Sequence, residues 1–236
     1  MLANDEYGWV RGQYLRVREQ VDEAALRANR RPEEVRLMAV TKTVEEALIR
    51  EAVAAGADLL GENKVQELAR KRGAFAQSEM HLIGHLQSNK AAKAAACADM
   101  VQSVDSLRLA AVLSDCCVKL GKRLPVLLEI NIGGDAAKFG FPPEEAEAAL
   151  AEIGQMQGLK VRGLMTVPPI SGNPRETAIF FSHMHKLFLD FSGKKMDNIT
   201  MDILSMGMSG DFAAAIAEGS TLVRVGTAIF GQRDYR

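Results

Sequence analysis

Short apolar segments alternate with longer amphipathic segments along almost the whole chain, and this alternation constrains the fold more than any other feature. The apolar segments are rich in Val, Ile, Leu and Met and have the length of strands, whereas the segments between them have apolar residues at helical spacing. The predicted strands are 36–42, 58–62, 80–84, 100–104, 125–132, 161–167, 200–206 and 221–227. The predicted helices between them are 45–55, 65–72, 90–98, 107–120, 144–156, 174–190 and 212–218.

Strands that are apolar on both faces are covered by helices on both sides, as in a parallel sheet. An open doubly wound sheet and a closed barrel both fit the pattern. Eight strands in 236 residues favour closure, because a (β/α)₈ barrel typically has roughly 250 residues. We therefore predict an α/β protein with a single domain over residues 1–236, namely a (β/α)₈ TIM barrel with an extra N-terminal helix over residues 4–30.

Two helix starts have residues typical of caps. Thr43 followed by Glu46 has the spacing of a capping box. Asn173 followed by Pro174 is typical of an N-cap and the first helical residue. We expect both helices to begin at these positions.

Charge and cysteine content argue against several classes of protein. The 29 basic and 30 acidic residues leave a net charge of −1, so no overall field attracts nucleic acid or an anionic membrane. The three cysteines are too few for a disulfide framework and indicate a reducing compartment. The N-terminus does not resemble a signal peptide, and no apolar segment has the length of a membrane span. We expect a cytoplasmic protein.

Lys42 ends the first predicted strand. It shares a face with Met38 and Val40 because side chains alternate along a strand. If that face is the barrel interior, the amine rises into the C-terminal mouth, where barrels have their active sites. An amine there could attack a carbonyl group. From position alone, a solvated lysine at a strand end is the commoner case, because lysines are mostly exposed.

Small and hydroxyl-bearing residues follow the last two predicted strands. They are Ser205, Gly207 and Ser209 after the seventh strand and Gly226 and Thr227 after the eighth. Barrels often bind phosphate in these two turns through backbone N–H groups. Turns of this composition are also common in α/β proteins that bind no phosphate there.

Arg224 lies on the same face of its strand as Gly226, so its guanidinium is predicted to point into the barrel near the phosphate turn. A buried arginine needs an acceptor or a charged partner. Either a bound ligand or a structural ion pair with Glu62 or Glu129 would satisfy it.

The remaining polar residues are less specific. Asn63 follows the second strand and could contact a ligand oxygen or cap the next helix. The four histidines have no cysteine or carboxylate cluster beside them, so we predict no metal site. The chain has no Walker or dinucleotide glycine pattern and no Ser-His-Asp arrangement around a nucleophile elbow.

Six segments in chain order carry a family resemblance. They are LMAVTK at 37–42, GEN at 61–63, HLIGHLQSNK at 81–90, GLM at 163–165, LSMGMS at 204–209 and VRVGTAIFG at 223–231. Together they resemble the pyridoxal phosphate homeostasis protein family, whose members are stand-alone relatives of the N-terminal barrel domain of bacterial alanine racemase. The series is far more specific than any one of its motifs.

The resemblance implies a cofactor and roles for the candidate residues. Lys42 would hold pyridoxal 5′-phosphate (PLP) as a Schiff base, and Arg224 would meet the pyridine nitrogen. Asn63 would lie near the phenolic oxygen of the ring. The turns at 205–209 and 226–227 would hold the phosphate. Lys138 matches a lysine of the family pattern, which assigns it no role here.

The expected function is to carry PLP without robust catalysis. Enzymes that use the ring as an electron sink usually place a carboxylate beside its nitrogen, where the resemblance puts Arg224. Related racemases add a tyrosine from a second domain, but this sequence ends at Arg236, soon after the last strand. Tyr7, Tyr14 and Tyr235 belong to predicted terminal helices. We therefore expect no catalytic residues, a monomer, and PLP-dependent apo-enzymes as candidate recipients.

Two alternatives remain. One is a PLP-dependent amino-acid racemase or lyase of narrow scope, with Lys42 as one base. The other is an aldolase or phosphosugar isomerase in which the lysine attacks the substrate directly and no cofactor takes part.

Overall fold

Eight parallel strands close into a barrel in the computed structural model, which describes residues 7–135, 137–169, 173–194 and 198–232. Each strand pairs with the next along the chain, and the eighth pairs with the first. The predicted closed barrel is therefore confirmed. The strands are β1 (Arg36–Val40), β2 (Leu59–Glu62), β3 (Glu79–Leu82), β4 (Met100–Val104), β5 (Leu124–Glu129), β6 (Leu159–Met165), β7 (Ile199–Ser205) and β8 (Leu222–Val225).

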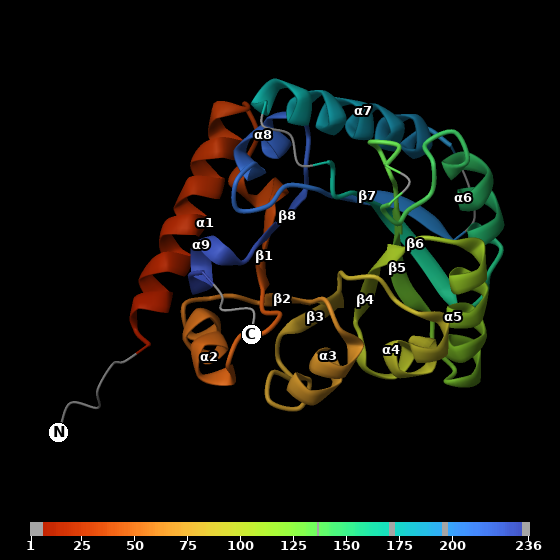
Figure 1. Ribbon diagram of the computed structural model, residues 1–236, viewed down its shortest axis with the longest axis horizontal. Helices are drawn as coiled ribbons and strands as arrows, with labels where there is room; N and C mark the ends of the chain where they lie inside the picture. The colour runs from red at the N-terminus through yellow and green to blue at the C-terminus, as the bar shows by residue number, and fades with distance from the viewer. Residues whose placement is uncertain (1–6, 136, 170–172, 195–197, 233–236) are drawn as a thin grey trace.

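Helices surround the ring of strands, as Figure 1 shows. They are α1 (Trp9–Arg27), α2 (Glu46–Ala54), α3 (Val65–Lys71), α4 (Ala91–Cys97), α5 (Leu107–Lys119), α6 (Ala146–Gly154), α7 (Pro174–Ser192), α8 (Phe212–Ala217) and α9 (Thr227–Phe230). Two single-turn 3₁₀ helices, η1 (Pro32–Glu34) and η2 (Ser88–Lys90), precede β1 and α4.

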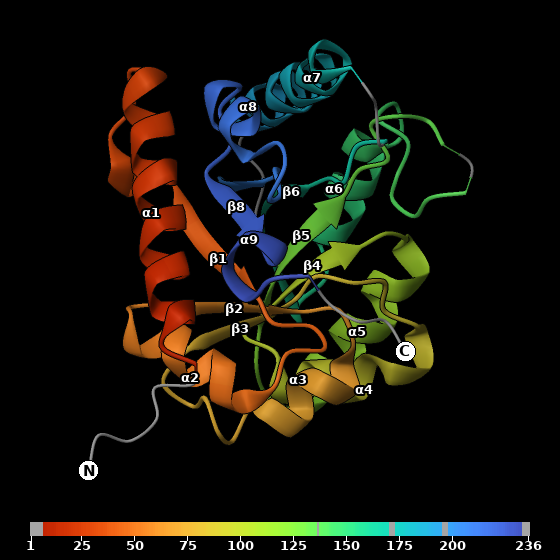
Figure 2. The same cartoon turned by 60° about the vertical axis from the view of Figure 1, so that its left-hand side comes forward.

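The extra helix α1 packs on the outside of the barrel beside α8 and α9 (Figures 1 and 2). Its buried face is formed by Val10, Tyr14, Val17, Val21, Ala24 and Ala25, which recur at helical spacing. Because α9 has only four residues, it is too short to cover the wall formed by β8 and β1. The N-terminal helix supplies that cover.

The core has two layers. Outward-facing residues such as Leu37 and Val223 pack under the helices. Inside the barrel lies a separate apolar cluster of Met38, Val40, Leu59, Met100, Leu127, Met165, Ile203 and Leu222. This alternation places Met38 and Val40 in the interior, as predicted, and Lys42 follows two residues after Val40, just beyond the end of the strand.

Strand ends and caps differ from the prediction in ways that matter for the mouth. β1 ends at Val40, so Lys42 lies in the following turn, and Thr227 begins α9 rather than ending β8. The predicted capping box is wrong. Thr43 has a φ of +57° and donates its N–H to Glu67 Oε2 at 2.9 Å, and α2 begins with no side-chain cap.

The predicted cap of the long helix α7 is confirmed. Asn173 is its N-cap residue, and its Oδ1 accepts from the Arg175 N–H at 3.1 Å. Pro174 occupies the first helical position.

Candidate functional site

A cavity of about 370 Å³ opens at the end of the barrel where the strands terminate. Its size lies within the range of small-molecule sites, which is roughly 300–1,000 Å³. It is lined by Val40, Lys42, Asn63, Ile83, Val167, Met208, Ser209, Gly210, Arg224, Gly226 and Thr227. These residues come from the C-terminal ends of β1, β2, β3, β6, β7 and β8 and the turns that follow them.

Lys42 is brought to this cavity by the geometry of β1, which places Val40 on the interior face and Lys42 two residues beyond it. Its amine makes no hydrogen bond or ion pair with any other described residue, and its side chain is partly buried. An amine without a competing partner inside a cavity can attack a carbonyl carbon.

Two turns beside Lys42 present unused backbone donors. Within the described ranges, the N–H groups of Ser209, Gly210, Gly226 and Thr227 have no hydrogen-bond acceptor. The turns are joined, since Ala228 N–H donates to Ser209 Oγ at 3.4 Å. Backbone N–H groups of neighbouring residues that line one cavity can bind an anion with several oxygen acceptors, such as a phosphate.

Arg224 reaches the cavity from β8 and is held by two neighbours. Nη1 donates to Ser205 Oγ at 2.6 Å, and Nη2 donates to the Thr166 carbonyl oxygen at 2.8 Å. Burial lowers its pKa to about 10, although the charges of Glu129 and Asp211 act in the opposite direction. The guanidinium is therefore fixed in place, and its remaining N–H groups are available to a ligand.

A chain of hydrogen bonds continues from Arg224 through the barrel interior. The Ser205 hydroxyl donates to Gln102 Oε1 at 2.7 Å. Gln102 Nε2 lies 2.8 Å from His81 Nδ1, and His81 Nε2 lies 2.7 Å from Glu79 Oε1. We refer to these five side chains as the interior chain.

The direction of every hydrogen bond in the interior chain follows from its first member. An arginine has only donors, so Ser205 accepts from Arg224 and gives its single proton to Gln102. The amide nitrogen of Gln102 then faces His81, whose Nδ1 must accept. His81 therefore carries its proton on Nε2 and donates it to Glu79. Burial lowers the pKa of His81, despite the opposing effect of Glu79, which agrees with a neutral ring.

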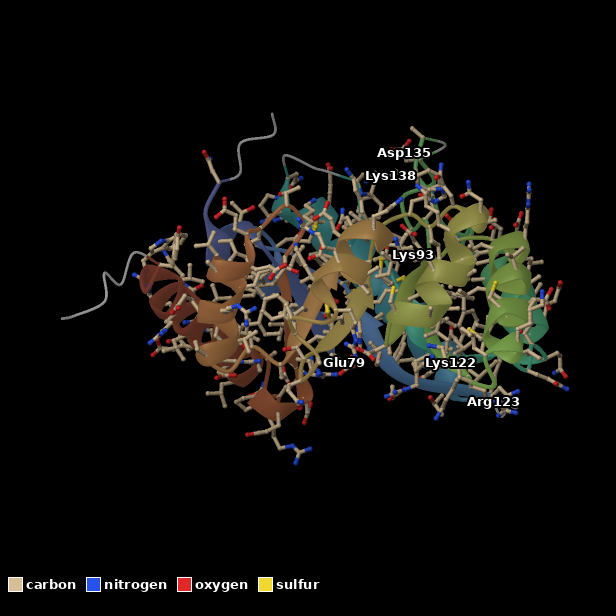
Figure 3. The ribbon with its side chains drawn as sticks, turned by 90° about the horizontal axis from the view of Figure 1, so that it is seen from below. Glu79, Lys93, Lys122, Arg123, Asp135 and Lys138 are labelled. Carbon is tan, nitrogen blue, oxygen red and sulfur yellow. The ribbon has the colours of Figure 1, made fainter. Side chains whose placement is uncertain are left out.

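The interior chain runs from one end of the barrel to the other. In Figure 3, Glu79 lies at the same end as Lys122 and Arg123, which precede β5. Asp135 and Lys138, which follow β5, lie at the opposite end. Since all strands are parallel, that opposite end is also the end with the cavity.

Neither proposed carboxylate partner forms a hydrogen bond with Arg224. Glu62 faces the other side of its strand, where its Oε1 accepts from Lys71 Nζ at 2.7 Å. Glu129, at the end of β5, interacts with Arg224 only through its charge. Burial raises the pKa of Glu129 to about 7, and the charge of Asp105 adds to this rise while Arg224 opposes it.

Six of the eight predicted site residues line the cavity: Lys42, Asn63, Ser209, Arg224, Gly226 and Thr227. Asn63 does not cap α3, whose N-cap is Lys64. Ser205 and Gly207 lie outside the lining. Ser205 is fully buried below Arg224, and Gly207 has a φ of +94° and lets its turn pack against Ala215 on α8.

Several residues of the site were not predicted. Ile83, Val167, Met208 and Gly210 also line the cavity. Ile83 could have been found from the alternation along β3, because His81 and Ile83 share a face. Val167 and Met208 lie in turns, where alternation gives no direction.

Two further properties concern the described residues only. No group of three His, Cys, Asp or Glu side chains among them could hold a metal ion. None of their helices combines the length and the apolar character that crossing a membrane requires.

Comparisons with known proteins place the chain in a family. Residues 16–234 match the family model described as alanine racemase, N-terminal domain. A pyridoxal phosphate homeostasis protein of Pseudomonas aeruginosa is 40% identical over 222 residues, which are 93% of this chain and 94% of that protein.

Two solved structures extend the likeness to three dimensions. An unknown protein from Bifidobacterium adolescentis is 36% identical with a TM-score of 0.90, over 97% of this chain and 98% of that one. PipY of Synechococcus elongatus with PLP bound is 36% identical with a TM-score of 0.77, over 89% of this chain and 100% of that one. The chain therefore belongs to the alanine racemase N-terminal domain family and, within it, to the pyridoxal phosphate homeostasis proteins.

Proposed function

We propose that this protein binds PLP in the cavity as a Schiff base on Lys42 and acts in PLP homeostasis as a carrier, without robust catalysis. The observation that carries the proposal is the meeting of three groups in one cavity. These are the amine of Lys42 and the N–H groups of the two turns, none of which is paired with another described residue, and the fixed guanidinium of Arg224.

The three groups correspond to three parts of the cofactor. An amine can bind the aldehyde, the unused N–H groups of the two turns can bind the phosphate, and a guanidinium can donate to the pyridine nitrogen. Asn63 lines the same cavity and is proposed to lie near the phenolic oxygen. When bound, PLP supplies a ring that accepts electrons, and this ring accepts them poorly when its nitrogen stays unprotonated. PipY, 36% identical, was solved with PLP bound.

Two observations support a carrier rather than a catalyst. None of the described residues that line the cavity is a tyrosine, and the Tyr14 hydroxyl donates instead to the Gly56 carbonyl oxygen at 3.3 Å. Tyr235 lies outside the described residues. Relatives at about 40% identity are named homeostasis proteins. We further propose a single-domain cytoplasmic monomer that can pass PLP to apo-enzymes.

The test compares wild type, Lys42→Ala and the matched control Lys64→Ala, which removes an exposed lysine nearby. Each protein is mixed with PLP, reduced with borohydride, and examined by visible spectrum and intact mass. We expect a coloured protein and a stable adduct for wild type and Lys64→Ala, and no adduct at this site for Lys42→Ala. A colourless wild type that takes up no PLP would overturn the proposal and favour a cofactor-free lysine enzyme.

Glu129 favours a second candidate function, a racemase or lyase of narrow scope. Its pKa of about 7 suits a group that takes up and releases protons at neutral pH. Glu129 is not among the residues that line the cavity, but its charge acts on Arg224, which does line it. This candidate predicts exchange of the Cα proton of some amino acid with solvent deuterium, and loss of that exchange in Glu129→Gln. NMR of PLP-loaded protein mixed with each amino acid measures this exchange. If wild type shows no exchange, the racemase or lyase is excluded and the carrier function stands.

A further inference from the structure

Lys71 is a fully buried lysine that lies behind the wall of the cavity. Its Nζ donates to the Thr41 carbonyl oxygen at 2.8 Å and to Glu62 Oε1 at 2.7 Å, and it lies 3.7 Å from Glu67 Oε2. The side chains of Lys71 and Glu62 have no exposed surface. Thr41 also donates from Oγ1 to Glu62 Oε1, at 2.6 Å. Four side chains thus meet between the sheet and α3.

This group contacts the backbone of β1 and β2, two of the strands that lead into the cavity, since Lys71 donates to the Thr41 carbonyl oxygen and Thr41 Oγ1 to the Gly61 carbonyl oxygen. Thr41 faces outward and directly precedes Lys42, and Glu62 faces outward and directly precedes Asn63. Lys71 is bonded to the carbonyl of the residue before Lys42. Lys71 of α3 therefore fixes the backbone just before Lys42, from the side of the sheet opposite to the cavity.

The residue after Lys42 is held as well, in an unfavourable conformation. Thr43 has a φ of +57°, which a β-branched residue adopts rarely. Its N–H donates to Glu67 Oε2 at 2.9 Å. Partial burial disfavours the charged form of Glu67, but the Thr43 N–H and Lys71 outweigh this and lower its pKa. Such strain persists where surrounding contacts fix it, and it is concentrated at functional sites.

Stability alone does not account for this group. A buried ion pair contributes little to stability compared with apolar residues of similar volume. Here one oxygen is also unsatisfied, since Glu62 Oε2 is buried without a partner among the described residues. Burying these charges costs free energy, and their contacts lie on both sides of Lys42, at Thr41 and Thr43. The conformation that they impose on Lys42 explains the group better than stability does.

We propose that Lys71, together with Glu62 and Glu67, positions Lys42 by fixing the backbone on both sides of it, so that the amine stays directed into the cavity. The inference rests on the proposed function, in which Lys42 forms the Schiff base with PLP. Lys71 itself does not touch the cofactor and is a positioning residue.

The test uses the double variant Lys71→Met/Glu62→Leu, which replaces the buried pair with apolar side chains and removes the donor to Thr41. We expect urea unfolding to remain close to wild type, because no buried charge is left unpaired. We expect Schiff-base formation with PLP, followed by absorbance and by the mass of borohydride-reduced samples over time, to be slowed roughly tenfold or more.

Arg72→Met/Asp99→Leu is the matched control. Arg72 follows Lys71 and is the C-cap residue of α3. Its Nη1 lies 2.6 Å from Asp99 Oδ2, and neither residue lines the cavity. The control therefore removes a neighbouring ion pair that has no contact with the cavity. We expect this variant to react with PLP at the wild-type rate. A general effect of losing an ion pair would slow both double variants equally and would overturn the inference.

Glu67 provides an independent arm if the double variant does not fold. Glu67→Gln keeps an oxygen acceptor for the Thr43 N–H and is expected to react at close to the wild-type rate, whereas Glu67→Leu is expected to react several-fold more slowly. Wild-type rates in both the double variant and Glu67→Leu would refute positioning while leaving the PLP proposal intact. A wild type that forms no adduct would instead remove the proposed function itself.

Discussion

Ser205 shows how much a single residue's role depends on its depth in the barrel. It was predicted as a phosphate ligand, but its hydroxyl lies between Arg224 and Gln102 and is fully buried. Ser205→Ala should lower the free energy of unfolding by about 1–3 kcal/mol, because a charged donor and a buried amide oxygen lose their partner. Ser209→Ala, on the cavity turn, should change it by less than about 0.5 kcal/mol. Urea unfolding without PLP measures both, and equal effects would contradict the assignment.

The same comparison shows what alternation along a strand can and cannot predict. It placed Lys42 and Arg224 correctly, because it determines which face of the sheet a side chain occupies. It does not determine how deep in the barrel a residue lies. The sequence therefore predicts Ser205 in the cavity, whereas the residue lies deeper in the interior, below Arg224. The conformation of Thr43 was also beyond prediction, since Glu67 on another helix holds it.

Glu129 should make stability depend on pH near neutrality. Its pKa is raised to about 7, so between about pH 4.5 and 7 the folded protein binds more protons than the unfolded chain. Stability therefore falls as the pH rises through this window. Glu129→Gln should be more stable than wild type by about 1–3 kcal/mol at pH 8 and similar at pH 4.5. Urea unfolding at both values tests this, with exposed Glu152→Gln expected to show no such difference.

Among the elements, β6 depends on a close backbone approach at Gly163 that leaves no room for a side chain. A Cβ on Gly163 would lie 1.8 Å from the Ile203 carbonyl oxygen of β7, and the pairing of β6 with both neighbours shifts register nearby. Gly163→Ala should therefore lower the free energy of unfolding by about 3 kcal/mol or more, since backbone must move. Gly12→Ala, on the exposed face of α1 with open space around it, should raise it by up to about 1 kcal/mol. Denaturant titration of both variants distinguishes local strain from a general intolerance of substitution.

The order and type of the main elements could be predicted from the sequence, but their ends could not. Predicted strands extend beyond the observed ones at residues 130–132 and 166–167, because Ile130, Ile132 and Val167 continue the apolar pattern after the strands end at Glu129 and Met165. The short elements η1 and η2 are not predicted, because three residues are too few to show a helical period. A C-terminal helix around Tyr235 is predicted, but Tyr235 lies outside the described residues, and α9 spans Thr227–Phe230. At the mouth, these short turns decide where Lys42 and Thr227 lie.

Barrel closure followed from the number of strands, whereas the interior chain could not be foreseen. Its members come from β3, β4, β7 and β8, and they meet only when the closed barrel brings inward-facing residues to the same level. Arg36 extends it, since Nη1 donates to Glu79 Oε2 at 2.8 Å. A path of polar side chains thus joins the two ends of the barrel. Arg224 at the cavity determines the direction in which each hydrogen bond of the interior chain is donated.

This path should make the whole barrel sensitive to acid through His81. Burial lowers the pKa of His81, with Arg36 acting in the same direction and Glu79 and Asp99 opposing it. Below about pH 6.5 the unfolded chain therefore binds a proton that the folded protein does not, and stability falls as the pH decreases. Protonation at Nδ1 would also oppose the donor of Gln102 and reverse the order of hydrogen bonds up to Ser205.

A glutamine at position 81 can accept from Gln102 and donate to Glu79 without titrating. His81→Gln should therefore match wild type at pH 7.5 to within about 1 kcal/mol but lose less stability between pH 6.5 and 5, by up to about 1.4 kcal/mol per pH unit. Carboxylates that titrate in this range contribute equally to both proteins. Urea unfolding at a series of pH values measures the difference in slope, and parallel curves would mean that the neutral His81 does not govern the acid response of the barrel.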